Sequence, residues 1–253
     1  MTPEKITTLK TAIAGNVILP GDATYDETRK IWNGMFDRKP AVIIRCKNVA
    51  DVIHAVDFGR ENKMLIAVKG GGHNSAGTAV CDDGLMIDLS LMNNVEVNAS
   101  TKTVKVQGGC LLSMVDAATQ KHGLAISSGI ISHTGVGGLT LGGGFGWISR
   151  KFGLSIDNLL SAEIVTAAGK VVNASATENP DLFWAIRGGG GNFGIVTTFE
   201  FKAGEIGNEV LSGPIVKSFD NVKEYCKSAS GFIAHSPNRR NSRFCISVAA
   251  ALV

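Results

Sequence analysis

The chain has 253 residues, which is enough for one large domain or two modest ones. Its formal net charge is only +3, so neither nucleic acid nor an anionic membrane surface is expected as the main partner. Hydrophobic residues make up 44%, which excludes a disordered chain, and no run of 18 apolar residues predicts a membrane span. Glycine is unusually frequent, with 31 copies, and most of them fall between Gly70 and Gly194.

The N-terminal sequence and the cysteines favour a cytoplasmic protein. No basic start is followed by an apolar core, so no secretory signal is predicted. The five cysteines (Cys46, Cys81, Cys110, Cys226 and Cys245) are widely spaced and odd in number, with no CxxC pair. We therefore expect reduced, mostly buried thiols and no metal site.

Caps, apolar periodicity and turn residues predict short helices and strands along the whole chain. Helices are predicted after Pro3, after the cap Asn48, over 111–122, from Pro180 to Arg187 and near 221–234. Strands are predicted over 41–45, 65–68, 85–89, 95–97, 103–107 and 194–201, in a hairpin over 161–175 that turns at Gly169, and near 210–216 and 244–253. These elements alternate without a steady βαβ rhythm, so the predicted fold class is α+β.

Three glycine clusters, at 69–74, 135–146 and 188–194, are candidates for anion binding. Glycine exposes its backbone N–H, and successive bare N–H groups bind phosphate. Three clusters near strand ends predict a diphosphate ligand in an extended groove. The alternative is that the glycines serve only tight turns and close strand packing.

Two familiar nucleotide motifs are excluded by their context. Gly189-x-Gly191-x-x-Gly194 satisfies GxGxxG, but it follows a predicted helix and precedes a predicted strand. A Rossmann fingerprint needs the reverse order, and no GxxxxGK[ST] sequence occurs. An NAD-type Rossmann site and a P-loop are therefore both rejected.

His73 is the strongest candidate for a functional side chain, because it directly follows Gly70-Gly71-Gly72 on a loop that leaves a predicted strand. A loop that binds a phosphate also places its next side chain against the ligand. An imidazole there can serve as acid, base or nucleophile. His54, His122 and His235 lack this context and are interpreted as solvated or core side chains.

Five ordered stretches resemble one known family. They are KGGGHNSAG (69–77), GLMIDLS (84–90), TGVGGLTLGGGFGWISRKFGLSIDNL (134–159), AEIVTAAG (162–169) and NPDLFWAIRGGGGNFGIVTTFEFK (179–202). Together they resemble the FAD-linked oxidases of the berberine-bridge-enzyme and 6-hydroxynicotine-oxidase group, which have the PCMH-type, vanillyl-alcohol-oxidase flavin fold.

The resemblance implies an N-terminal helix and lead-in (1–35), a PCMH-type FAD-binding domain of two α+β subdomains (36–204) and a partial substrate domain (205–253). It implies FAD as cofactor, with His73 matching the histidine bonded to the flavin 8α-methyl. The residues implied to contact FAD are Lys69, Gly70, Gly71, Gly72, His73, Asn74, Gly77, His133, Thr134, Gly135, Gly137, Gly138, Gly142, Gly143, Gly144, Gly146, Asn158, Gly194, Ile195 and Val196.

The sequence departs from the family pattern in two ways. Where bicovalent members carry a second flavin-linking cysteine, this chain has Ile131, so a single link through His73 is implied. Cys110 lies elsewhere and does not take that role. The family also continues into a substrate domain that holds the usual catalytic base, and most of that domain is expected to be missing here, so no catalytic residue is assigned.

Three functions remain open at this stage. The first is an FAD-dependent oxidase that takes a hydride from a carbon bearing nitrogen or oxygen, with dioxygen as acceptor and a small molecule as substrate. The second is a catalytically incomplete FAD-binding fragment. The third, an NAD(P)H-using reductase of the same fold superfamily, lacks any nicotinamide signature.

Overall fold

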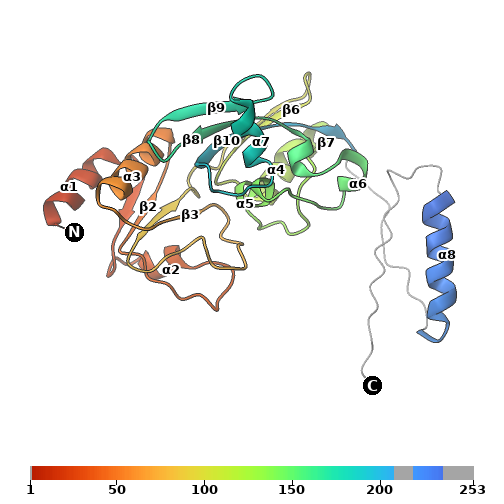
Figure 1. Cartoon of the computed structure of the whole chain (residues 1–253), viewed down its shortest axis with the longest axis horizontal. Coiled ribbons are helices and arrows are strands. Elements are labelled where there is room, and N and C mark those ends of the chain that lie inside the picture. Colours follow the sequence, from red (N-terminus) through yellow and green to blue (C-terminus); the bar gives the residue numbers. More distant parts are fainter. Residues whose placement is uncertain (1, 208–218, 236–253) are drawn as a thin grey trace.

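The computed structural model describes residues 2–207 and 219–235, which contain two main sheets with helices packed around them (Figure 1). The first sheet has the strand order β1-β2-β4-β3 and the second the order β5-β6-β10-β8-β9. A short third sheet pairs β7 with β11. Parallel pairing is confined to the first sheet, so the predicted α+β class is confirmed.

The first sheet is built around the buried strand β4 (Leu85–Asp88). Strands β2 (Val42–Arg45) and β3 (Ile66–Lys69) both pair with it in parallel, and β1 (Asn16–Ile18) adds to β2 in the antiparallel sense. Helix α3 (Val49–Glu61) packs on this sheet through its buried apolar stripe. The chain leaves β3 directly into the first glycine cluster.

Helix α3 begins where its cap predicts. The Asn48 side chain accepts a hydrogen bond from the Asp51 amide at 3.0 Å and satisfies one first-turn donor of the helix. The buried Asp51 carboxylate in turn accepts the amides of Ala14 and Gly15 at 2.8 and 3.0 Å. These bonds attach the residues that follow α1 (Pro3–Ala12) to α3.

The second sheet is antiparallel throughout. Its central strand β10 (Ile195–Lys202) pairs with β6 (Thr103–Gln107) and β8 (Leu159–Val165). Strands β5 (Val95–Asn98) and β9 (Val171–Ser175) form the two edges.

The predicted hairpin of β8 and β9 is confirmed, with Gly169 in its turn at a φ of +71°. This turn rests on α3. Arg60 donates from Nη1 to the Ala167 carbonyl at 3.0 Å, and a Cβ on Gly169 would lie 2.4 Å from Asp57 Oδ1. The hairpin therefore connects the second sheet to α3, the helix that packs on the first sheet.

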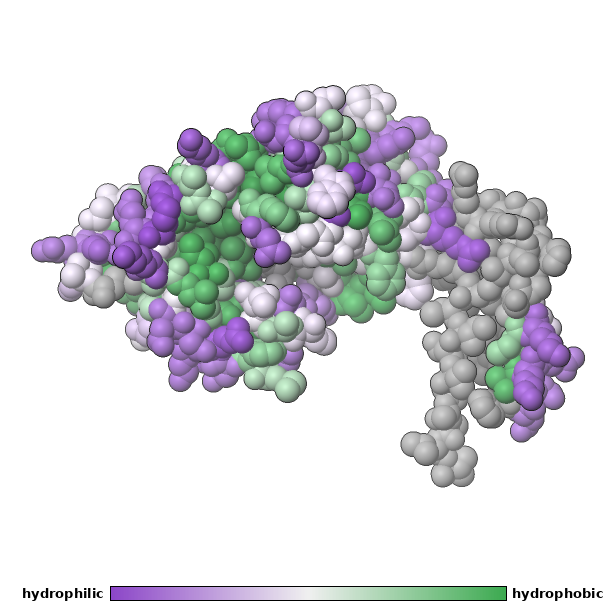
Figure 2. Space-filling view, viewed as in Figure 1, coloured by the Kyte–Doolittle hydropathy of each residue, from purple (hydrophilic) through white to green (hydrophobic). Residues whose placement is uncertain are grey.

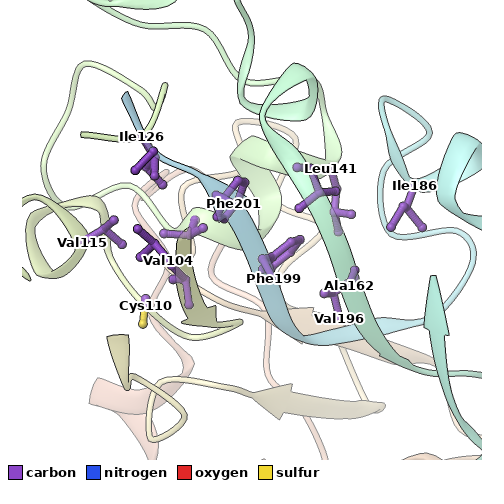
Figure 3. Packing of buried hydrophobic residues seen from close by; sticks show 14 of the residues in the cluster. Val104, Cys110, Val115, Ile126, Leu141, Ala162, Ile186, Val196, Phe199 and Phe201 are labelled. Carbon is purple, nitrogen blue, oxygen red and sulfur yellow. The ribbon is translucent and has the colours of Figure 1, made fainter. Parts of the chain in front are cut away.

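One large apolar cluster covers the second sheet (Figure 3). Phe199 and Phe201 are fully buried on one face of β10, with ring centroids 5.8 Å apart, and Val104 is buried beside them. Each buried phenylalanine contributes about 2 kcal/mol of hydrophobic free energy. Val165 and Ile195 of the second sheet belong to the apolar cluster of the first, so packing as well as hydrogen bonding joins the two sheets.

The other helices and strands of the described residues are shorter or lie outside the two main sheets. They are α2 (Tyr25–Arg29), α4 (Leu112–Thr119), β7 (Leu124–Ala125), α5 (Val136–Leu141), α6 (Ser149–Phe152), α7 (Pro180–Ile186), β11 (Gly204–Glu205), α8 (Val222–His235) and the 3₁₀ helices Gln120–His122, Ser155–Asp157 and Phe219–Asn221. None of the helices in the two described stretches has the length and apolarity that a membrane crossing needs.

The sequence patterns predict the longer elements and not the short ones. They do not predict β1, α2, α5, β7 or β11, since each spans six residues or fewer and completes no clear period. The helix predicted over 111–122 is divided into α4 and a 3₁₀ turn, and the helix predicted near 221–234 is present as α8. The strands predicted near 210–216 and 244–253 lie outside the described residues.

Candidate functional site

The first glycine loop (residues 69–77) leaves a row of backbone amides free. In the described part of the chain, no N–H from Gly70 to Ala76 donates to a protein acceptor. Gly72 is buried at a φ of +66°, a conformation that favours glycine, and Gly77 has a φ of +69°. Buried amides need partners, and consecutive free ones form an anion-binding nest. The loop can therefore hold a phosphate.

The second glycine cluster lies directly against this loop. A Cβ on Gly71 would sit 2.3 Å from the Gly135 nitrogen, and a Cβ on Gly135 would sit 2.3 Å from the Gly71 nitrogen. The two backbones touch at a distance that excludes any side chain. Helix α5 starts after Gly135, and within the described residues its amides at Gly137 and Gly138 also lack a protein acceptor.

A pocket of about 370 Å³ opens beside these loops. Its floor includes backbone at Gly144, which has a φ of +70°, next to Gly143 at +112°. Its apolar wall includes Ile131 and Phe145, which are 43% and 72% exposed. The lining residues are His73, Gly129, Ile130, Ile131, Thr134, Leu139, Gly142, Gly144 and Phe145.

His73 is held by two other rings at this pocket. Its Nε2 lies 2.8 Å from His133 Nδ1, and the Trp32 indole stacks on it with centroids 4.8 Å apart and planes 21° apart. Burial, and secondly the neighbouring His133, lower the pKa of His73 below its ordinary value. The imidazole is therefore neutral at pH 7. Among the described residues its Nδ1 has no hydrogen-bond partner, so this nitrogen is available as a nucleophile.

Residues 28–36, called here the Trp32 segment, run along the first glycine loop. The Trp32 amide donates to the Gly72 carbonyl at 3.0 Å, and Asn33 Nδ2 donates to the Ser75 carbonyl at 2.8 Å. Sequence reasoning missed this segment, because it carries no glycine cluster, no motif and no periodic pattern. Its position is set by tertiary contacts alone.

Lys69 anchors the start of the loop through its side chain. Its Nζ donates to the Thr28 carbonyl at 2.7 Å and lies 3.5 Å from the buried carboxylate of Asp88. Asp88 also accepts the Ser90 amide at 2.7 Å. The ammonium group is therefore committed to protein partners, and the implied contact of Lys69 with a cofactor stays a prediction.

Asn158 closes the far end of the second glycine stretch. Its Nδ2 donates to the carbonyls of Phe152 and Leu154, both at 2.8 Å. The buried Ser155 supports the same stretch by donating to the Ser127 carbonyl at 2.7 Å. Isolated serines in a loop carry no spacing signal, so the sequence could not assign them this part.

The third glycine cluster uses its first three amides internally. Gly188 and Gly190 both donate to the Leu141 carbonyl, at 3.1 and 3.0 Å, and Gly189 donates to Ala185 at 3.1 Å. These bonds cap the ends of α5 and α7. The cluster follows α7 and precedes β10, so the rejection of a Rossmann site is confirmed.

The other implied contact residues lie around these three loops. Gly194 has a φ of +140°, and Ile195 and Val196 are buried in β10, so any contact they make with a ligand would use backbone atoms. Asn74 is exposed and accepts the Thr78 amide at 3.2 Å. Their roles toward a cofactor stay predictions.

Three of the four cysteines in the described part of the chain are buried. Cys46, Cys81 and Cys110 are buried and free, and Cys226 is exposed. Burial raises the pKa of Cys110 to about 11, and its Sγ donates to the Asn94 carbonyl at 3.3 Å. Across residues 2–207 and 219–235, no three His, Cys, Asp or Glu side chains group as a metal site requires.

The described surface is partly apolar. Figure 2 shows hydrophilic residues in purple at the end of the body that holds α1, and hydrophobic residues in green across the middle of the same face. At the site itself, Trp32 stacks on His73 and Phe145 lines the pocket, and both side chains are exposed. Free amides beside an apolar pocket fit a ligand that joins phosphates to a flat ring.

Comparison with known proteins agrees with this geometry. A family model described as "FAD binding domain" matches residues 40–175, which is more than half of the chain. (R)-6-hydroxynicotine oxidase of Paenarthrobacter nicotinovorans is 39% identical over 202 residues, which cover 80% of this chain and 44% of that protein.

Solved structures give the same result. The crystal structure of 6-hydroxy-D-nicotine oxidase from Arthrobacter nicotinovorans superposes with a TM-score of 0.82 at 36% identity, covering 87% of this chain and 49% of that one. Glucooligosaccharide oxidase from Acremonium strictum, whose structure title names a 6-S-cysteinyl, 8α-N1-histidyl FAD, gives 0.74 at 35% identity, covering 79% and 42%.

The chain thus spans about half the length of the relatives that it matches. The family match and the two-sheet architecture confirm the resemblance that the glycine motifs predicted. The chain therefore belongs to the FAD-binding domain family and has the PCMH-type fold.

Proposed function

We propose that the chain binds FAD, with the diphosphate on the free amides of the first and second glycine loops and the flavin in the pocket beside His73. The observation that carries the proposal is the position of His73, a neutral imidazole within a run of seven free backbone amides, from Gly70 to Ala76. The fit is supported by Gly71 and Gly135, whose contact leaves bare N–H groups that side chains would otherwise cover.

We further propose that His73 is bonded to the 8α carbon of the flavin through Nδ1. Attachment would form one N–C bond and would break the N–H bond of the imidazole and one C–H bond of the methyl group. Two protons and two electrons leave, and dioxygen takes them up to give hydrogen peroxide, so the step balances. His133 occupies Nε2 and keeps that nitrogen out of the reaction.

The whole protein is then an oxidoreductase. The bound flavin would accept a hydride from a carbon bearing nitrogen or oxygen in a small substrate and pass the electrons to dioxygen. The residues of this chain bind, orient and shield the ring. Ile131 and Phe145 provide apolar wall, and the loop amides neutralise the phosphate charge.

The test uses the purified 253-residue chain loaded with FAD. We expect acid-precipitated protein to stay yellow and to show flavin fluorescence in a denaturing gel, with the mass increased by one flavin. The His73→Ala variant should lose the fluorescence entirely, whereas His122→Ala, a change at an exposed histidine, should keep it. Release of all the flavin from the unaltered protein on precipitation would contradict the covalent link.

A second candidate is a catalytically incomplete FAD-binding fragment. It is favoured by the coverage of 44–49% of the matched relatives. A peroxide assay with amines, alcohols and sugars, run on protein whose flavin is already attached, separates the two, because only the oxidase then produces peroxide from a substrate. Bleaching of NAD(P)H without peroxide would instead support the reductase.

A further inference from the structure

The Trp32 segment brings one aromatic ring to the site from outside the region that the family model covers, which begins at residue 40. We propose that Trp32 is a positioning residue for flavin attachment and that its stacked indole fixes the plane of the His73 imidazole. This inference rests on the proposed covalent link between His73 and FAD.

The indole is exposed but its backbone is fixed. Trp32 is 62% exposed, although its amide is bonded to Gly72, the residue directly before His73. The neighbouring Asn33 is bonded to Ser75. Two hydrogen bonds thus hold the segment on both sides of His73 along the loop, and the only ring contact of Trp32 among the described residues is with that imidazole.

His73 needs such a contact because its surroundings restrain it weakly. It follows three glycines, and its hydrogen bond to His133 fixes one nitrogen while leaving the ring free to tilt about that bond. A stacked indole restricts the tilt. The hydrogen bond and the stack together determine where Nδ1 points, and attack on a carbon requires such alignment within a narrow range.

The role of Trp32 in positioning His73 is distinct from the binding of FAD. The free amides that fit the diphosphate belong to Gly70–Ala76 and to the start of α5, and Trp32 donates its own amide to the Gly72 carbonyl rather than toward the ligand. Removing the indole should therefore slow attachment while leaving the affinity for FAD nearly unchanged.

The experiment follows covalent attachment over time after FAD is added to flavin-free protein. Samples are quenched in acid, and the covalent flavin is read by gel fluorescence. We expect Trp32→Ala to slow attachment about tenfold, and Trp32→Phe, which keeps a stacking ring, to stay within about threefold of the unaltered rate. Trp184→Ala removes another exposed tryptophan, on α7, and should leave the rate unchanged.

Reversible FAD affinity is measured in the His73→Ala background, with and without Trp32→Ala, by quenching of flavin fluorescence. Equal affinities support positioning, and a loss as large as the loss of rate would overturn it, since Trp32 would then bind the flavin directly. Attachment at full rate in a folded Trp32→Ala protein would also overturn it while leaving the covalent link intact. Absence of covalent flavin in the unaltered protein would overturn the proposed function as well, so the two failures are distinguishable.

Discussion

The first and third glycine clusters have similar compositions but use their leading amides differently. In the first, residues 69–77, the seven amides from Gly70 to Ala76 have no protein acceptor in the described chain. In the third, Gly188 and Gly190 direct their amides to a single carbonyl at the end of α5, and the amides from Gly191 to Gly194 have no protein acceptor among the described residues. The first cluster thus leaves a longer run of donors for a ligand, and the third uses its leading donors in capping.

This difference shows that glycine density alone does not identify a phosphate site. A long run of amides without protein acceptors favours such a site, and this run has seven residues in the first cluster and four in the third. The family model agrees with this distinction, since its match includes the first two clusters and ends at residue 175, before the third. Substitutions that act on one cluster and not on the other test whether the two differ in FAD binding.

The largest expected effect is that of Gly71→Ala. The new methyl group would lie 2.3 Å from the Gly135 nitrogen, and backbone cannot yield as a side chain can. We expect the free energy of unfolding to fall by about 3 kcal/mol and FAD binding to be lost. Chemical denaturation and flavin fluorescence measure the two effects. A variant with normal stability would show that the two loops are not in backbone contact.

The second expected effect is a dependence of flavin attachment on pH. Burial and His133 lower the pKa of His73, and only the neutral imidazole has the lone pair that attacks. The attachment rate should be constant well above the lowered pKa and fall about tenfold per pH unit below it. Reversible FAD binding by His73→Ala should not follow this curve. Attachment that accelerates in acid would contradict the assignment.

The sequence predicts those parts of the site that neighbouring residues determine. The glycine loops, His73 and the rejection of the GxGxxG motif could be predicted because a loop, a strand end or a helix end lies within a few residues of each. The contact between Gly71 and Gly135 could not be predicted in this way, since the two residues are far apart in sequence and only the fold brings them together.

The Trp32 segment shows more clearly what the sequence cannot predict. No cap, periodicity or motif surrounds Trp32, and its stack on His73 arises from tertiary bonds to the first loop. The sequence likewise treats the clusters as equivalent, because the partner of the third, the Leu141 carbonyl, becomes available only when α5 forms. Amide satisfaction is a property of the folded chain.

The third prediction is that Gly138→Ala raises the stability of the protein and lowers its affinity for FAD. Gly138 lies in α5 with an exposed, free amide, and a Cβ there would meet nothing within 4 Å. Gly138→Ala should therefore stabilise the flavin-free protein by up to about 1 kcal/mol through helix propensity. The same methyl group would enter the space beside the nest, and FAD affinity should fall about tenfold, or 1.4 kcal/mol. Unchanged affinity would remove α5 from the binding site.

The smallest expected effect is that of Gly191→Ala in the third cluster. This glycine has open space around its Cβ position and no positive φ, so the substitution should change stability by less than about 0.5 kcal/mol. If the cluster only caps α5 and α7, FAD affinity measured in the His73→Ala background should also stay within about twofold. A clear loss of affinity with normal stability would place the third cluster on the ligand. Both clusters would then bind FAD, and amide satisfaction would no longer separate them.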